Sequence, residues 1–475
     1  MFEIYNIILY PEILLSIIIL GLVIYGIKLS TLKVSISFLF IVGVLVCFHP
    51  SNNIFNFQAF DALQLSNGLL SINNWMVIIK LIIIIGSISI LLISSLEDKT
   101  SPVLILIVTL SSLLLVSSIN WLSLYLTLEL QTLSLFILVA LKRDSAYGTE
   151  AGLKFFVLGA LSSGLFLFGC ALLYGLTGET SIQGISQGAN IINYEENLLL
   201  LSGEVGKIFI TISLLFKLSA APFHMWAPDV YEGAPVTITA LLATIPKIAG
   251  FAILVQIGPI VNVILICAVL SIIYGSIGAL NQTKIMRLFA YSGISHIGFI
   301  LFGIAIGSFE GLQASLIYMI IYILMSICSF SIILSLSLYK GLLVELGGLS
   351  RDNPVLSITL TLTFLSIAGI PPLAGFFSKW LILLSGISAG YYLISLIIVI
   401  CSVIAGVYYV RIVKIIKFQT GYPLLIWQKV LNKRKDQLDF KKSLLIGVSF
   451  FFILFLMISP NFLLQLTYDA TISIY

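Results

Sequence analysis

The chain carries very little charge for its length. Of its 475 residues, only 9% are Asp, Glu, Lys or Arg, whereas 60% are hydrophobic. Soluble domains carry about 25% charged residues. The low value excludes a soluble globular domain and indicates an integral membrane protein throughout.

Patterns that would bind metals are also missing. The cysteines lie far apart in apolar segments without a CxxC pair, and the histidines are scattered: Cys47, Cys170, Cys267, Cys328 and Cys401, with His49, His224 and His296. This spacing supports neither an iron–sulfur cluster nor a zinc site, and a haem pair is not expected. We therefore interpret the cysteines as packing residues and expect no cofactor or metal site in this chain.

A leader of the transit-peptide kind is missing as well. The first residues, MFEIYNIILYPEILLSIIILGLVIYGI, contain no Arg/Lys-rich stretch and no small-residue cleavage site. They predict a first spanning helix. If the protein is mitochondrial, we expect it to be made inside the organelle.

The chain is rich in long apolar segments. A membrane span needs about 20 mainly apolar residues, and an all-α polytopic fold with about fourteen transmembrane helices is expected. The ranges are 5–27, 32–49, 73–95, 102–119, 121–141, 153–176, 206–225, 236–257, 259–280, 288–308, 311–338, 357–385, 388–416 and 442–464. An even number of spans places both termini on one side.

Basic residues gather in the loops on one side of the predicted membrane. Loops after odd-numbered spans hold Lys28, Lys33, Lys99, Lys142, Arg143, Lys284, Arg287, Lys340, Arg351 and the run QKVLNKRKDQLDFKK. The long loops 50–72 and 177–205 contain no Lys or Arg, and the second is acidic, with Glu179, Glu195, Glu196 and Glu204. Because positive loops stay inside, we expect both termini to face the intermembrane space or periplasm.

Four charged residues remain deep inside apolar segments: Glu129, Lys217, Lys247 and Lys379. A charge at the bilayer centre costs about 3 kcal/mol on insertion scales, so such residues mark ion or proton pathways by default. Desolvation disfavours the charged form of a buried lysine, which allows it to exchange protons near neutral pH. The sequence therefore predicts a proton path along these side chains, with Glu129 as the natural partner of Lys217.

Two further lysines lie nearer the ends of spans. Lys207 begins its span and can extend its side chain to the outer surface. Lys80 lies about two turns into the third span. For Lys80 two interpretations stay open, a side chain that reaches the surface and a polar contact to another subunit.

Two predicted spans carry helix-breaking prolines beside their lysines. Pro222 follows Lys217 in ITISLLFKLSAAPFHMW, and Pro371 and Pro372 precede Lys379 in LSIAGIPPLAGFFSKW. Proline removes a backbone donor and clashes with the preceding turn. Breaks at membrane depth are tolerated where they are buried in protein or line a water-filled cavity. The alternative is that the prolines only kink the two helices and that these kinks have no function.

Paired breaks also predict how the chain is organised. Interrupted helices in corresponding positions of two halves indicate inverted repeats, here two five-helix repeats of spans 4–8 and 9–13. The order of lysine and proline differs between the two breaks, so equivalent lysine geometry does not follow. We expect one transmembrane bundle over 1–475, with N-terminal helices in 1–100, repeats in 102–257 and 259–416, and a basic loop with the last helix in 417–475.

The motifs resemble the antiporter-like membrane subunits of respiratory complex I. KLSAAPFHMWAPDVYEGAPVTITALLATIPKIAGF is similar to the core of that family, LNQTKIMRLFAYSGISHIGF to its link into the tenth helix, and AGIPPLAGFFSKW to its broken twelfth helix. LSLYLTLELQTLSLF and EAGLKFFVLGALSSGLFLFG resemble its fifth and sixth helices. The resemblance covers most of the chain, from about span 4 to span 13.

The resemblance implies a role for each buried charge. Glu129 and Lys217 would be the ion-paired elements of a first half-channel, Lys247 the central lysine and Lys379 the exit-side lysine of the second half. His296 could be the neighbour of Lys379 along the polar axis. A capping or packing role for His296 is preferred, because it lies near the matrix end of its predicted span.

Four other charged positions have no obvious part in proton transfer. Glu150 and Lys154 match a charged pair at the sixth helix, and a solvated i,i+4 pair explains them equally well. Asp229 and Glu232 lie in a matrix loop. We expect these two acids to anchor the loop and not to conduct protons.

The resemblance further implies a proton-translocating subunit of NADH:ubiquinone oxidoreductase in the mitochondrial inner membrane, or in a bacterial inner membrane. NAD, FMN, iron–sulfur clusters and ubiquinone would belong to partner subunits. The partners would be other membrane-arm subunits, including neighbouring antiporter-like chains, and lipids, with no nucleic acid. Two alternatives stay open: a cation/proton antiporter of the same fold, and a structural membrane scaffold whose charges only join helices.

Overall fold

The fold is given by a computed structural model. The described residues are 10–26, 31–47, 63–65, 69–94, 100–142, 144–182, 197–258, 260–336, 340–419 and 439–474. Several predictions lie outside them: those for His49, Lys28, Lys99, Arg143, Glu195, Glu196, most of the outer loop 50–72 and the basic loop 420–438. The account below concerns the described residues.

The apolar segments form helices, which satisfy every backbone polar group within the segment, as a bilayer requires. Ten are long and apolar enough to cross a membrane: α4 (Asn74–Ile93), α5 (Thr100–Ser117), α6 (Trp121–Val139), α7 (Ala146–Thr177), α11 (Val236–Ile257), α12 (Val261–Ala279), α13 (Ile285–Ile306), α14 (Phe309–Ser335), α18 (Tyr392–Phe418) and α20 (Phe440–Ile458). The all-α membrane fold is confirmed.

Further elements complete the described part. Four are apolar helices: α2 (Tyr10–Tyr25), α3 (Thr31–Cys47), α16 (Pro354–Ala368) and α17 (Ala374–Ser388). The others are α9 (Asn197–Lys217), α10 (Trp226–Gly233), η1 (Leu343–Leu346), α15 (Leu349–Asp352), α21 (Asn461–Ile472) and a small hairpin of β1 (Leu63–Leu65) and β2 (Leu70–Ile72). The hairpin was not expected. The number of fourteen spans and the inverted repeats stay predictions.

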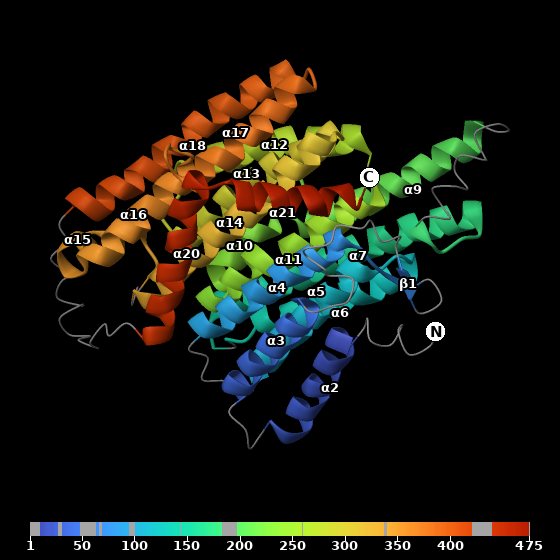
Figure 1. The fold of residues 1–475 in the computed structure, drawn as a ribbon, viewed down its shortest axis with the longest axis horizontal. Coiled ribbons are helices and arrows are strands. Elements are labelled where there is room, and N and C mark those ends of the chain that lie inside the picture. The colour runs from blue at the N-terminus through green and yellow to red at the C-terminus, as the bar shows by residue number, and fades with distance from the viewer. Residues whose placement is uncertain are drawn as a thin grey trace. The chain divides into compact units, whose positions relative to one another are not determined.

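The chain divides into two compact units (Figure 1). Unit 1 comprises Met1–Leu218, Leu241–Val263 and Tyr468–Tyr475, and unit 2 comprises Ser219–Ala240 and Ile264–Thr467. Within unit 1, α7 packs along α9 and α5 along α6. Within unit 2, α13, α14 and α17 pack together, and α16 and α18 lie side by side. The predicted boundaries of the repeats stay predictions.

Both predicted helix breaks are confirmed. Helix α9 ends at Lys217, and turns lead from there to α10, with Ala221–Pro222 in the cis form. The predicted span 357–385 is two helices, α16 and α17, separated by residues 369–373 with a cis Pro371–Pro372 bond. Gly369 follows α16 with φ +86°, a left-handed conformation that favours glycine. The prolines therefore lie where helices end, close in sequence to Lys217 and Lys379.

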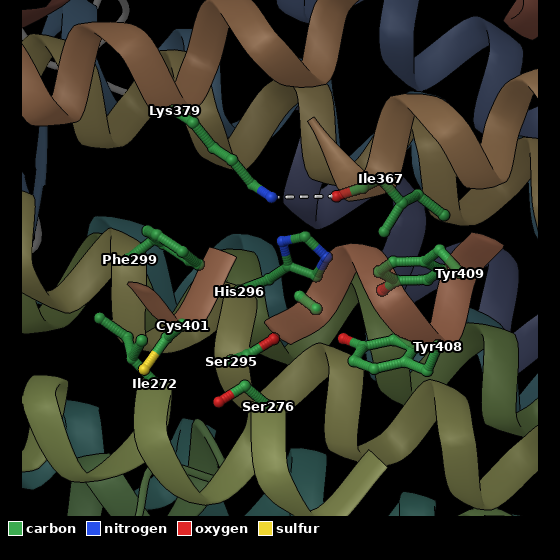
Figure 2. A pocket seen from close by; sticks show the side chains of 11 residues that line it. Ile272, Ser276, Ser295, His296, Phe299, Ile367, Lys379, Cys401, Tyr408 and Tyr409 are labelled. Carbon is green, nitrogen blue, oxygen red and sulfur yellow. Dashed lines mark hydrogen bonds between the residues drawn. The ribbon is translucent and has the colours of Figure 1, made fainter. Parts of the chain in front are cut away.

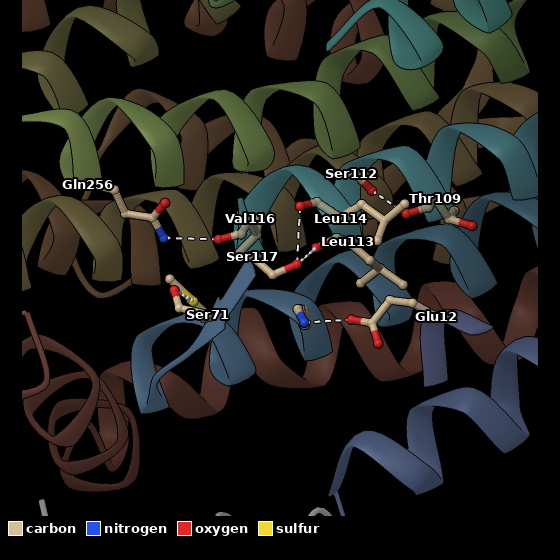
Figure 3. Close-up of polar contacts among 11 residues, drawn as sticks. Glu12, Ser71, Thr109, Ser112, Leu113, Leu114, Val116, Ser117 and Gln256 are labelled. Carbon is tan, nitrogen blue, oxygen red and sulfur yellow. Dashed lines mark hydrogen bonds and ion pairs between the residues drawn. The ribbon is translucent and has the colours of Figure 1, made fainter. Parts of the chain in front are cut away.

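Lys80 corrects one expectation. Its ammonium group forms an ion pair with the Glu12 carboxylate at 2.5 Å, and the two side chains are only 3% and 4% exposed (Figure 3). Neither a surface-reaching side chain nor a contact to another subunit describes this lysine. A buried charge persists when a partner on another helix neutralises it, and here the partner is on α2, 68 positions earlier.

Candidate functional site

Glu129 and Lys217 belong to unit 1 and lie on α6 and α9. Glu129 accepts a hydrogen bond from the Thr132 hydroxyl at 3.3 Å. Within the described residues, however, neither the Lys217 Nζ atom nor the Glu129 Oε1 atom has a hydrogen-bond partner. The structure therefore shows no direct ion pair between these two side chains, of the kind that the family resemblance implies.

The backbone around Lys217 favours a positive charge. Lys217 is the last residue of α9, and the C-terminal carbonyls of a helix attract cations. Ser219, two residues later, has φ +60°, an uncommon conformation for a residue other than glycine. The chain therefore turns sharply just after Lys217. The C-terminal end of α9, which carries a partial negative charge, faces this turn.

Lys247 lies in the middle of α11 in unit 1. It is the twelfth residue of this 22-residue helix, and its side chain is 1% exposed. Pro246, directly before it, lies inside the helix and cannot donate a backbone hydrogen bond. The predicted mid-membrane depth of Lys247 agrees with its position in the helix.

Lys379 in unit 2 reaches back across the break between α16 and α17. Its ammonium group donates hydrogen bonds to the carbonyls of Ala368 at 2.7 Å and Ile367 at 3.3 Å. These carbonyls end α16, so the charge sits where the helix dipole is negative. The ammonium group also lies 5.4 Å from the centre of the Phe299 ring, within the range of a cation–π contact.

Lys379 and His296 line the same small cavity in unit 2 (Figure 2). The polar lining also includes Ser276, Ser295, Tyr408 and Tyr409. The free volume, about 10 Å³, holds about one water molecule. Figure 2 shows the Lys379 side chain pointing toward the His296 imidazole, with Tyr408 and Tyr409 beyond the ring.

His296 lies deeper than expected. The sequence places it near the matrix end of a span that begins at 288, whereas α13 begins at Ile285 and His296 is its twelfth of 22 residues. The imidazole is 3% exposed, and its Nδ1 atom is 2.7 Å from the Tyr318 hydroxyl. It therefore does not cap the helix.

The other charged positions form pairs away from this cavity. In unit 2, Asp229 and Glu232 on α10 pair with Arg287 at 3.0 and 3.2 Å, and Glu232 also pairs with Lys284. Glu150 and Lys154 form an i,i+4 pair at 2.7 Å, and both are exposed. These contacts agree with anchoring and solvated roles.

The sequence reasoning missed the aromatic partners of the cavity. Phe299, Tyr318, Tyr408 and Tyr409 were counted as apolar residues, although three of them bring hydroxyl groups into the buried region. A signal was available for Tyr408 and Tyr409, because the hydroxyl group of a tyrosine buried in an apolar span usually needs a hydrogen-bond partner. Within the described residues, no group of three or more His, Cys, Asp and Glu side chains could hold a metal ion.

Comparison with known proteins places the chain in a family. The model of the transmembrane family of NADH:quinone oxidoreductase and Mrp antiporter subunits matches residues 118–405, more than half of the chain. The chain belongs to this family. The matched residues contain Glu129, Lys217, Lys247, His296 and Lys379, and the resemblance inferred from the motifs is confirmed.

Individual members of the family agree. NADH-ubiquinone oxidoreductase chain 2 of Metridium senile is 61% identical over 385 residues, which are 80% of this chain and 99% of that protein. NADH-quinone oxidoreductase subunit N of Paramagnetospirillum magneticum is 44% identical over 67% of this chain and 68% of its own length. A chain in the structure of respiratory complex I from Thermus thermophilus has the same fold, with a TM-score of 0.80 at 24% identity over 96% of this chain and 98% of that one.

Proposed function

We propose that this chain is the chain 2 membrane subunit of a respiratory NADH:ubiquinone oxidoreductase and that it moves protons through the membrane. The observation that carries the proposal is the setting of the three lysines. Lys247 is in the middle of a spanning helix, Lys217 is the last residue of α9, and the Lys379 ammonium group binds the carbonyls that end α16. Lysine at such depth is expensive, and three of them within one family-matched segment indicate a transfer path.

The residues suit a path in which a proton moves from one amine to the next through water. A nearby carboxylate favours the charged form of a lysine, so a change in the separation of Glu129 and Lys217 would load or release a proton there. Ionisable groups coupled in this way exchange protons as a unit. Lys247 would pass the proton on, and Lys379, held at the end of α16 beside the cavity, would release it toward the outer side.

We infer the cofactors, partners and location of the whole complex from the relatives of this chain. NAD, FMN, iron–sulfur clusters and ubiquinone would be held by partner subunits, and this chain would contain no redox centre. Its partners would be other membrane-arm subunits, including neighbouring antiporter-like chains, and lipids. We propose the mitochondrial inner membrane as the location, with both termini on the intermembrane-space side.

The decisive experiment compares Lys247→Ala and Glu129→Gln in the assembled complex in membrane vesicles. The measured quantities are the amount of complex, the NADH:ubiquinone turnover and the number of protons moved per NADH. We expect the proton yield to fall while the complex still assembles. Lys154→Ala is the matched control, because it removes an exposed lysine that pairs with the exposed Glu150. If Lys247→Ala and Glu129→Gln both leave the proton yield unchanged, the chain is a structural scaffold whose charges only join helices.

A subunit of a cation/proton antiporter is the second candidate, because the family that matches the chain includes Mrp antiporter subunits. Purification from membranes separates the two. Isolation together with flavin- and iron–sulfur-containing subunits supports the first function. Cation-driven proton transport by a complex without such subunits supports the second.

A further inference from the structure

The last four carbonyls of α16 are all used, although a helix cannot satisfy them internally. The backbone N–H of Gly369 donates to the carbonyls of Leu365 and Ser366, at 3.1 and 2.9 Å. The two carbonyls that follow accept hydrogen bonds from the Lys379 ammonium group. The end of α16 is therefore completed partly by the next turn of the chain and partly by a charge on α17.

The hydroxyl group of Ser366 joins this helix end to two other helices. Its oxygen accepts a hydrogen bond from the backbone N–H of Gly375 in the first turn of α17, at 3.3 Å, and it donates to the Met325 sulfur on α14, at 3.1 Å. The first N–H groups of a helix have no partner within it, and Leu373, directly before α17, has no polar side chain to supply one. One buried hydroxyl therefore connects α14, α16 and α17.

Gly375 brings the start of α17 directly against Ser366. A Cβ atom at residue 375 would lie 1.8 Å from the Ser366 carbonyl oxygen and 3.3 Å from its hydroxyl oxygen. Lys379 follows four residues after Gly375, so both lie on the same face of α17. The place at which the first turn of α17 meets Ser366 therefore decides where the Lys379 side chain meets the end of α16.

The two connections between α16 and α17 differ in how they depend on charge. The hydrogen bonds from Lys379 are charge-assisted, and such bonds are about twice as strong as neutral ones. They weaken when Lys379 becomes a neutral amine. The hydrogen bonds of Ser366 involve a hydroxyl, a backbone N–H and a thioether, none of which changes its charge. The connection through Ser366 therefore persists in both charge states of Lys379.

We propose that Ser366 is a positioning residue that holds the first turn of α17 on the end of α16 while Lys379 gains and loses its proton. This inference rests on the proposed function. After Lys379 has released a proton, Ser366 keeps the neutral amine beside the same two carbonyls. The next proton then binds at the same place. Ser366 itself carries no proton along the path, since its hydroxyl keeps its hydrogen throughout.

The test compares Ser366→Ala, Ser366→Thr and Ser366→Val in the assembled complex in membrane vesicles. The readouts are the amount of complex, the NADH:ubiquinone turnover and the protons moved per NADH. Threonine keeps the hydroxyl, whereas valine has nearly the same shape without it. We expect Ser366→Ala and Ser366→Val to lower the proton yield at unchanged turnover, and Ser366→Thr to stay closer to the wild type. A merely structural role predicts equal yields in Ser366→Thr and Ser366→Val.

Controls and contrary results are defined in the same assay. Ser357→Ala removes a buried hydroxyl from the other end of α16, where it donates to the Pro354 carbonyl, and it leaves the proton yield unchanged. A wild-type yield in Ser366→Ala overturns the inference, as do equal yields in the threonine and valine variants. Lys379→Met is measured beside them. If that variant pumps normally, the proposed function fails, whereas a loss there with normal Ser366→Ala removes only the role of Ser366.

Two further measurements keep the inference open to refutation. Met325→Leu conserves the volume of the side chain but removes the sulfur that accepts from Ser366, and it decides the matter if Ser366→Ala assembles poorly: a lowered proton yield supports the inference and a wild-type yield overturns it. A high-resolution electron cryomicroscopy map of the Ser366→Ala complex reports the position of Lys379. Displacement of its amine from the end of α16 supports the inference, and an unchanged position overturns it.

Discussion

Glu12 and Lys80 form a buried ion pair at 2.5 Å between α2 and α4, the first and third described helices of unit 1. Removing one partner of a buried pair leaves an uncompensated charge, at a cost of about 3–5 kcal/mol. Lys80→Met should therefore reduce the amount of assembled complex and its thermal stability in detergent. Replacing both residues, as Glu12→Gln with Lys80→Met, should restore much of the loss. A double variant as unstable as the single one would contradict this expectation.

Gly369→Ala tests the space that Lys379 needs. A Cβ atom there would lie 2.8 Å from Lys379 Cδ and 3.0 Å from Nζ, and the φ of +86° costs a non-glycine residue about 1–2 kcal/mol. We expect a lower proton yield per NADH at similar turnover. Gly390→Ala is the control, because its φ is +82° and nothing lies within 4 Å of its Cβ position. Equal proton yields in the two variants would show that crowding of Lys379 has no consequence.

Gly375→Ala tests the close contact of the two half-helices. A Cβ atom at residue 375 would lie 1.8 Å from the Ser366 carbonyl oxygen, so α16 and α17 could not keep their packing. The variant should fail to accumulate in the complex, as an immunoblot of native gels would show. Gly406→Ala, with nothing within 4 Å of its Cβ position in α18, should accumulate normally. Normal assembly of Gly375→Ala would mean that the break can rearrange.

Asp229→Asn tests the anchoring role of the α10 acids. The Asp229–Arg287 pair is about a third exposed on each side, and exposed pairs contribute about 0–1 kcal/mol. We expect a small loss of thermal stability that fades at high salt, with an unchanged proton yield. Glu232→Gln, which loses contacts to both Lys284 and Arg287, should cost more. A large fall in proton yield without loss of stability would assign these acids to the path instead.

The sequence alone predicted features that depend on local chemistry. Pro222, Pro371 and Pro372 mark the ends of helices because proline cannot continue them, and the structure confirms both breaks. The depth of Lys247 followed from counting residues along one apolar segment. Each of these properties is decided within about 20 residues of chain.

Features that depend on distant residues could not be predicted. Glu12 and Lys80 are 68 positions apart, so nothing in either segment indicates the other. His296 was placed too close to a helix end because Arg287 resembled a loop residue, whereas Arg287 lies inside α13 and is neutralised by Asp229 and Glu232. Which tyrosines face the cavity depends on the rotation of α14 and α18 about their axes, which the nearly uniform apolar pattern leaves open.

The Lys379 ammonium group donates hydrogen bonds to the carbonyls of Ala368 and Ile367, so the charge of Lys379 determines how firmly the end of α16 is held. A charged donor holds a carbonyl about twice as strongly as a neutral one. If Lys379 loses its proton, its hydrogen bonds to the end of α16 become weaker, and the backbone there becomes more mobile. Each proton that passes this lysine would therefore weaken and then restore the connection between α16 and α17, so that a change of charge would be converted into a change of backbone mobility.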